Sequence, residues 1–329
     1  MSKYLIFSDL HLGLKKDDPL FHKVSLDLAT WMRDEARSRN IKDIIFLGDL
    51  FHNRKSVSVD TLSIASSFFD ILSEFHISLI PGNHDCLYLD NSSVHSLSPF
   101  KRTNISIYDT PTILNLKPGI KLGFIPWGTK IDDIQNCDYM FGHFEIVGFQ
   151  FGNSFCKHGM SAECLLEKSK NIFSGHFHKA QRASVNGGHI TYVGSPFQHN
   201  WGEAGQDKYI YQLDIETGEL EFIENKTAPK HVLVNIDEYD IGCVDNIVRI
   251  LYVNNEDNLK KLEAIRKSNP LFLDSMVIEE SANISKSISD YKSVSILDSF
   301  KNEINSLDYS NEFKSSVYDK CKTLYDLHS

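Results

Sequence analysis

The sequence lacks the features that mark membrane proteins, disulfide-rich scaffolds and nucleotide-driven motors. No apolar run in its 329 residues is long enough to span a bilayer. There is no C-x-x-C pair, and the six cysteines are scattered. The N-terminus runs directly into a strand pattern without a secretory signal, so we expect reduced thiols in a cytoplasmic protein (host cytoplasm for a phage protein). The phosphate-binding pattern Gly-x-x-x-x-Gly-Lys-Ser/Thr is also missing, which excludes a recognisable P-loop for ATP.

An excess of positive charge is absent as well. The chain has 34 Lys and Arg against 44 Asp and Glu, a net charge of −10. This balance argues against a general binder of polyanions but leaves room for an enzyme that holds phosphates through metal ions. With 41% hydrophobic residues, the chain can form one large domain and a smaller one.

The first hundred residues alternate between strand-like and helix-like patterns. Apolar runs at 4–7, 44–47 and 78–80 predict buried strands. Helical spacing of apolar residues predicts helices over 19–39 and 59–72, the second from Val59, Leu62, Ala65, Phe69 and Leu72. This order predicts a parallel α/β core.

Beyond residue 100 the pattern is rich in strands. The candidates are 105–108, 112–116, 121–125, 138–141, 171–174, 189–193, 208–214 and 219–223. We therefore predict an α/β fold of the four-layer kind, a β-sandwich flanked by helices, over 1–226. A small α/β domain is expected over 229–285, with a strand at 247–253, a helix at 256–268 and a strand at 271–279. Helical spacing returns over 292–329, a helical C-terminal tail.

Five polar motifs follow strand-like runs. They are Asp9-Leu10-His11, Gly48-Asp49, Gly82-Asn83-His84-Asp85, Gly142-His143 and Gly175-His176-Phe177-His178. Each motif alone is an ordinary turn or strand end. Together they supply carboxylate, amide and imidazole groups suited to two divalent ions, which can bind a phosphate ester and activate water.

The residue types narrow the metal. Asp9 and His11 can point toward one ion, and the two oxygens of Asp49 could bridge two ions. Asn83, His143, His176 and His178 complete the candidates. Nitrogen and oxygen ligands without thiolate suit manganese, iron or zinc better than copper or an iron–sulfur cluster.

These motifs resemble the calcineurin-like metallophosphoesterase superfamily. The resemblance implies the metallophosphoesterase fold, with Asp9, His11, Asp49 and His178 on one ion and Asp49, Asn83, His143 and His176 on the other. The arginine and glycine that follow the Gly-Asp motif in protein phosphatases of this superfamily are missing here. The stretches 8–13, 48–52 and 192–196 instead resemble recombination nucleases of the SbcD type, and 142–149 resembles their phage members. The match covers residues 3–225.

That resemblance implies a manganese-dependent DNA exonuclease or endonuclease acting in recombination and repair. It also implies a coiled-coil ATPase partner of the structural-maintenance type and a homodimer. His84 would serve the leaving group, Asp85 would orient His84 or only shape the turn, and His52 would be a second catalytic histidine. Surface or packing roles are expected for His22, His76, His95, His158, His189, His199, His231 and His328.

Contacts outside the motifs are less specific. Phosphate contacts are expected from lysines and arginines near loop tips: Lys15, Lys16, Arg54, Lys55, Lys101 and Arg102. By resemblance, 229–285 would face DNA. The segment 292–329 would dock on the ATPase or fold back on its own domain. The dimer would use 59–72 or 86–100, although core packing leaves the same pattern.

Two other functions remain open. The same scaffold could be a phosphomonoesterase or a cyclic-nucleotide phosphodiesterase. Alternatively, the chain could be a non-catalytic protein that clamps DNA within an assembly.

Overall fold

The computed structural model describes residues 3–117, 119–152, 154–240, 245–269, 271, 274–278, 314 and 318. These residues form two compact units, the first built mainly from residues up to Val232, and the second from residues within 233–239, 250–264 and 274–278. The predicted limits at 1–226 and 229–285 stay predictions. The predicted tail at 292–329 lies outside the described residues, apart from 314 and 318.

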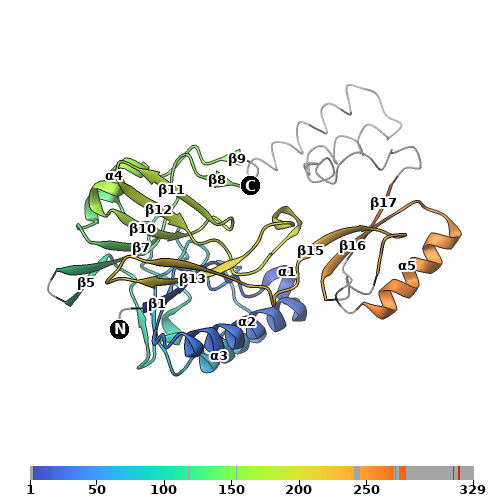
Figure 1. Ribbon diagram of the computed structural model, residues 1–329, viewed down its shortest axis with the longest axis horizontal. Coiled ribbons are helices and arrows are strands. Elements are labelled where there is room, and N and C mark those ends of the chain that lie inside the picture. The colour runs from blue at the N-terminus through green and yellow to red at the C-terminus, as the bar shows by residue number, and fades with distance from the viewer. Residues whose placement is uncertain are drawn as a thin grey trace. The chain divides into compact units, whose positions relative to one another are not determined.

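The first unit contains two six-stranded sheets (Figure 1). The strand order of the first sheet is β14-β13-β1-β2-β3-β4. Its strands are β1 (Lys3–Phe7), β2 (Asp43–Phe46), β3 (His76–Leu79), β4 (Ile105–Ile107), β13 (Tyr209–Asp214) and β14 (Leu220–Glu224). Strands β1 to β4 run parallel, and β13 and β14 add antiparallel pairs. The parallel α/β core predicted for the first hundred residues is therefore confirmed.

The second sheet has the order β11-β12-β10-β7-β6-β5. Its strands are β5 (Thr112–Lys117), β6 (Ile120–Ile125), β7 (Tyr139–His143), β10 (Asn171–Gly175), β11 (Gln181–Val185) and β12 (Gly188–Tyr192). The four central strands are parallel. The shorter elements are α1 (Leu14–Asp17), α4 (Ala162–Lys168), the hairpin β8 (Gln150–Phe151) and β9 (Ser154–Phe155), and 3₁₀ turns at Ser98–Phe100, Ile131–Asp133 and Trp201–Glu203. Of these strands, β8, β9 and β11 were not predicted.

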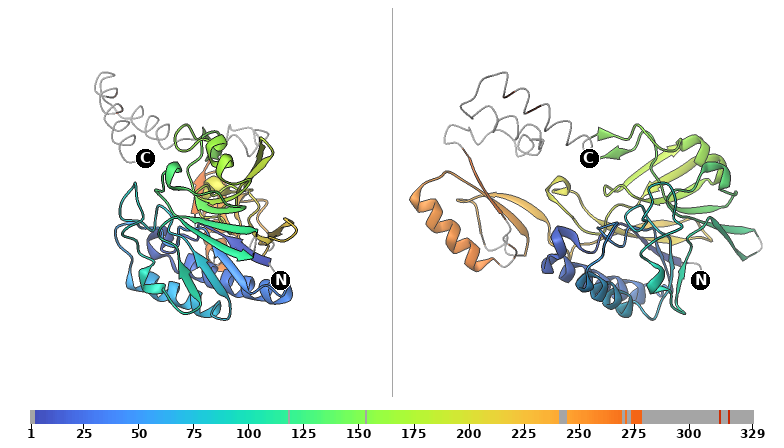
Figure 2. Two further views of the ribbon diagram at one scale, coloured as in Figure 1. Left: turned by 90° about the vertical axis from the view of Figure 1, so that its left-hand side faces the viewer. Right: turned by 180° about the vertical axis from the view of Figure 1, so that it is seen from behind.

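Helices α2 (Pro19–Ser38) and α3 (Val59–Ile71) begin at side-chain caps. The Asp18 carboxylate accepts the N–H of Leu20, with Pro19 in the first turn, and the Ser58 hydroxyl accepts the N–H of Thr61. Both helices lie together on one side of the first sheet (Figure 2). In α3 the predicted apolar face is partly wrong, because Val59 and Leu62 are exposed and Phe68 is buried instead.

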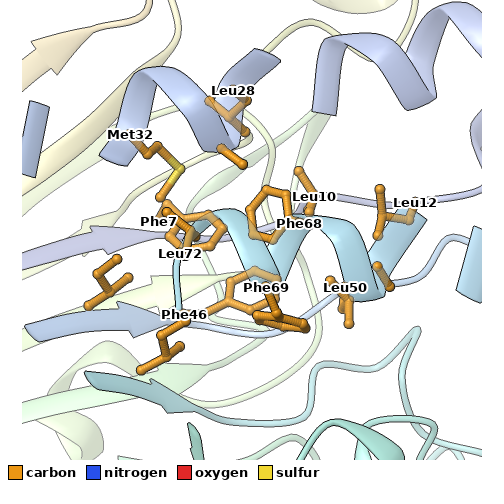
Figure 3. Packing of buried hydrophobic residues seen from close by; sticks show 14 of the residues in the cluster. Phe7, Leu10, Leu12, Leu28, Met32, Phe46, Leu50, Phe68, Phe69 and Leu72 are labelled. Carbon is orange, nitrogen blue, oxygen red and sulfur yellow. The ribbon is translucent and has the colours of Figure 1, made fainter. Parts of the chain in front are cut away.

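Alternation along the buried strands builds three hydrophobic cores. Phe7 and Phe46 face α2 and α3, where they pack against Phe68, Leu28 and Met32 (Figure 3). Ile6 and Ile45, one residue away, lie in the core between the two sheets. The outer face of the second sheet packs against α4 through Leu165 and Leu166. The layer order is helix, sheet, sheet, helix, which confirms the predicted fold class.

A three-stranded sheet of order β15-β16-β17 follows in the chain. Its elements are β15 (His231–Asn235), β16 (Ile247–Tyr252), α5 (Glu256–Ser268) and β17 (Asp274–Val277). The predicted strand–helix–strand pattern is confirmed for β16, α5 and β17, whereas β15 was missed. Among the described residues, no helix has the length and apolar character needed to cross a membrane.

Candidate metal centre

The polar motifs meet where the carboxyl ends of parallel strands from both sheets come together. Asp9 and His11 follow β1, Asp49 follows β2, and Asn83 follows β3. From the second sheet, His143 is the last residue of β7, and His176 and His178 follow β10. All seven predicted ligands therefore come to one place, as expected for loops after parallel strands.

Backbone conformation at this place is strained. Asp9, His11, Asp49 and His176 have φ values of 54°, 50°, 59° and 91°, a region that residues other than glycine rarely adopt. Such strain persists only where the surrounding structure imposes it, and it clusters at functional sites. Gly82 is required by close approach, since a Cβ there would lie 2.2 Å from Oδ1 of Asp49. The fold thus turns these particular side chains inward at an energetic cost.

The first ligand set comprises Asp9, His11, Asp49 and His178. Nε2 of His11 lies 3.1 Å from Nε2 of His178, 3.5 Å from Oδ2 of Asp49 and 4.0 Å from Oδ1 of Asp9. Ligands about 2.1 Å from a common ion are separated by about 3 to 3.5 Å. The residues present therefore fit a divalent ion.

The second ligand set comprises Asp49, Asn83, His143 and His176. Oδ1 of Asn83 lies 3.0 Å from Nε2 of His143 and 2.9 Å from Nδ1 of His176. Nε2 of His143 is also 3.4 Å from Oδ2 of Asp49. This spacing fits a second ion equally well.

Asp49 belongs to both sets through one oxygen. Its Oδ2 faces His11 on one side and His143 on the other, while its Oδ1 accepts the N–H of His84 at 2.8 Å. The expectation that the two oxygens would each take one ion is therefore wrong. Because Oδ1 is held by the backbone, Oδ2 is the oxygen available to be shared.

Neighbouring groups leave the correct ring nitrogens free. Nδ1–H of His143 donates to the carbonyl oxygen of Leu47 at 2.6 Å, and Nδ1–H of His178 donates to Oε1 of Glu203 at 2.9 Å. In each ring the opposite nitrogen, Nε2, keeps its lone pair for a metal. Such partners of ligating histidines set the tautomer and the ring orientation.

Burial and mutual contact determine the charges in the centre. Burial raises the pKa of Asp49, but His143 close by outweighs it and brings the pKa well below its usual range. Burial lowers the pKa of His143, and the Asp49 carboxylate more than reverses this, raising it to about 9. Burial lowers the pKa of His176 to about 3. An ion entering the second set must therefore displace the proton of His143.

His84 and His52 lie beside the first set. Their rings are stacked with centroids 5.9 Å apart, and they lie 4.7 and 5.6 Å from the His11 ring. Nδ1–H of His84 donates to the carbonyl oxygen of His52 at 2.7 Å, so Nε2 of His84 is the free nitrogen.

Asp85 does not hold the His84 ring. Its buried carboxylate accepts the N–H groups of Gly82, Asp49, Leu50 and Phe51 at 2.8 to 3.2 Å. The predicted orienting role is therefore wrong, and the alternative, that Asp85 shapes the turn, is confirmed. By bonding to the backbone on both sides of Asp49, it fixes the loop that carries the shared carboxylate.

The predicted basic contacts fall into two groups. Lys15 and Lys16 are exposed on α1, and Lys55 is exposed with Arg54 half-buried in the loop after Asp49. Arg102 instead pairs with Asp70 in the last turn of α3, at the edge where the parallel strands begin. Arg102, and with it Lys101, therefore does not lie beside the motifs, and that prediction is wrong.

Sequence reasoning missed a buried cluster behind His178. Glu203 and Lys208 are each 5% exposed, with Nζ of Lys208 2.6 Å from Oε2 of Glu203. Lys208 also donates to Oγ of Ser195 and to the carbonyl oxygen of His178. His199, expected to have a surface or packing role, is buried against His11 and His178. The resemblance at 192–196, just before this cluster, was the signal that could have led to it.

Trp127 was also missed. Its ring lies 5.1 Å from that of His176 and 6.0 Å from that of His143, and its indole N–H donates to the carbonyl oxygen of Leu89. It lines a cleft of about 290 Å³ on the side of the second set. An aromatic wall therefore flanks this set.

A two-sheet α/β fold with paired His and Asp ligand sets at its strand ends is typical of metal-dependent phosphoesterases. The family model described as calcineurin-like phosphoesterase matches residues 2–236. The chain belongs to this family, which uses divalent metal ions.

Individual relatives are more distant. The chain is 29% identical over 282 residues to exonuclease subunit 1 of enterobacteria phage T4, covering 80% of each chain. It is 25% identical over 276 residues to SbcD, a component of the SbcCD nuclease of Escherichia coli K12, covering 68% of this chain and 67% of the relative. A dimetal phosphatase from Danio rerio is 11% identical with a TM-score of 0.41, over 64% of this chain and 91% of that chain.

Proposed function

We propose that this chain is the metal-dependent DNA nuclease subunit of a recombination and repair complex, and that it hydrolyses phosphodiester bonds. The observation that carries the proposal is the convergence of two ligand sets on Oδ2 of Asp49. The phage relative named exonuclease subunit 1 and the bacterial nuclease SbcD support DNA as the substrate and a multisubunit setting in the cytoplasm.

The metal ions are two divalent cations, for which we propose Mn²⁺. The first would be held by Asp9, His11, Asp49 and His178, and the second by Asp49, Asn83, His143 and His176. When bound, such a pair supplies an activated water and positive charge for the phosphate oxygens. Mixed imidazole, carboxylate and amide ligands suit manganese.

His84 is the proposed catalytic acid. Its Nδ1–H is committed to the His52 carbonyl oxygen, so its free Nε2 can hold a proton for the leaving oxygen of the phosphodiester. His52, whose ring stacks on that of His84, is a second catalytic or strand-positioning histidine. Lys15, Lys16, Arg54 and Lys55 remain the proposed phosphate contacts of the DNA.

Partners are proposed from the resemblance and from the surface. A coiled-coil ATPase would dock on 292–329, and 229–285 would face DNA. For a homodimer, the regions named from the sequence do expose apolar side chains. These are Val59 and Leu62 on α3 and Leu87, Tyr88, Leu89 and Val94 in the loop 86–100.

One digestion experiment tests this function against its alternatives. Purified chain is incubated with Mn²⁺ and end-labelled duplex or single-stranded DNA, with and without the ATPase, and in parallel with nucleotide monoesters and cyclic nucleotides. We expect shortened DNA. Hydrolysis of the nucleotides alone would indicate a phosphomonoesterase or cyclic-nucleotide phosphodiesterase, and DNA binding without hydrolysis would indicate a non-catalytic clamp.

A further inference from the structure

The feature that the proposed mechanism leaves unused is a third imidazole beside the first ligand set. His199 follows β12 and is 1% exposed. Its ring is edge-on to those of His11 and His178, with centroids 5.3 and 4.9 Å away. One nitrogen from each of the three rings lies within 4.8 Å of the other two. His199 is therefore close to the ion that the first set would hold.

Neither ring nitrogen of His199 has a hydrogen-bond partner. The nearest carboxylate oxygen with which it is paired, Oε1 of Glu203, is 4.0 Å from Nδ1, beyond hydrogen-bond reach. That oxygen is already used by His178 at 2.9 Å. A buried polar group without a partner costs about 1–3 kcal/mol, and native structures contain few of them. The position thus calls for a ligand that these atoms can bind.

A histidine kept only for packing does not explain this arrangement. Phe197, two residues earlier, is fully buried and contacts the His199 ring, so the site already accepts an aromatic hydrocarbon. A phenylalanine in place of His199 would fill the same volume without stranding two polar atoms. Imidazole nitrogens are, in contrast, good ligands for divalent transition metals.

We propose that His199 is an additional ligand of the ion in the first set, which would then bind three imidazoles from His11, His178 and His199. This inference rests on the proposed metal centre and deepens it. It makes the two ions unequal, since the second set has only the imidazoles of His143 and His176. A site richer in nitrogen favours the later first-row metals, so the first ion would be held more tightly than oxygen ligands alone allow.

The test compares His199→Phe with wild type in the full chain, after metal removal by chelation. Mn²⁺ binding is measured by calorimetric titration, and nitrogen ligands are counted by pulsed electron paramagnetic resonance. His231→Phe is the matched control, because His231 is also buried with an unpartnered Nδ1, but it packs on Trp201 away from the ligand sets. His199→Gln is a second variant that keeps a polar side chain.

We expect His199→Phe to weaken one of two Mn²⁺ sites by about tenfold or more and to remove one nitrogen coupling. Without metal it should unfold at the same temperature as wild type or higher, because its two unpartnered nitrogens are gone. His231→Phe should leave both affinities unchanged.

The proposal is overturned if His199→Phe binds both ions as wild type does, or loses no nitrogen coupling. If that variant does not fold, unchanged binding by His199→Gln overturns it equally. Wild type measured in the same preparation separates the two levels of inference. Wild type that binds two ions and cuts DNA keeps the proposed function whatever His199 does, whereas wild type that binds no ion removes both.

Discussion

The two ligand sets share Asp49 but are supported in different ways. In the second set, His143 belongs to a strand and donates to a backbone carbonyl, that of Leu47. In the first set, His178 lies beyond its strand and donates to a side chain, Glu203, which is itself paired with Lys208. The second set is thus held by the sheets, and the first by a buried pair of charges.

This difference predicts unequal sensitivity to mutation. A backbone carbonyl inside a sheet cannot be removed by changing one side chain. A buried ion pair can be broken by a single change, which leaves an unpaired buried charge and is strongly destabilising. We therefore expect the first set to be the weak point of the centre.

The largest effect is expected where the comparison has no meaning, at the shared residue. Asp49→Asn keeps the shape of the side chain and an oxygen for the N–H of His84, but removes the charge that both ions would share. Both Mn²⁺ affinities should fall, and hydrolysis should drop by roughly 10³-fold or more. Calorimetry with a DNA-cleavage assay checks this. Two ions bound as in wild type would refute the shared-oxygen geometry.

The next largest effect separates chemistry from metal binding. His84→Ser removes the ring whose free Nε2 lies next to the first set, yet it touches no atom of either set through that ring. Cleavage should fall by about 10²- to 10⁴-fold, while both Mn²⁺ sites and DNA binding are retained. DNA cut at the wild-type rate would end the assignment of His84 as the acid.

A direct test of the comparison targets the support of the first set alone. Glu203→Gln should weaken one Mn²⁺ site by about 10- to 100-fold and leave the other unchanged, because the partner of His178 loses its charge. Glu163→Gln, an exposed carboxyl in the first turn of α4, is the control.

The paired variant Glu203→Gln with Lys208→Met sharpens the result. It leaves no buried unpaired charge, so stability should recover relative to Glu203→Gln alone, while the metal site should stay weak. Equal loss at both sites in either variant would show that the two sets are not supported independently.

The same contrast explains what sequence could predict. Ligands at strand ends were found because apolar strands are periodic, and parallel strands bring their carboxyl ends to one edge. His199, Glu203 and Lys208 follow β12 in loops and a 3₁₀ turn, where no periodicity marks which side chains turn inward. Arg102 was misplaced because a loop tip does not reveal which edge of the sheet it occupies. Asp85 was misassigned because backbone N–H groups compete for a carboxylate unseen in sequence.

The smallest effect concerns a buried histidine outside both sets. Burial lowers the pKa of His231 from 6.5 to about 4, so the folded chain keeps the ring neutral where the unfolded chain protonates it. Its contribution is therefore present above pH 6.5 and is lost as the pH falls from 6.5 toward 4. Between pH 7 and pH 5 this costs about 2 kcal/mol of unfolding free energy at most. Urea unfolding of wild type and His231→Leu at both pH values, in chelator, measures it. The loss of stability on acidification should be smaller in the variant. An equal loss would mean that His231 is not the titrating group, and that the imidazoles of the ligand sets account for the acid sensitivity.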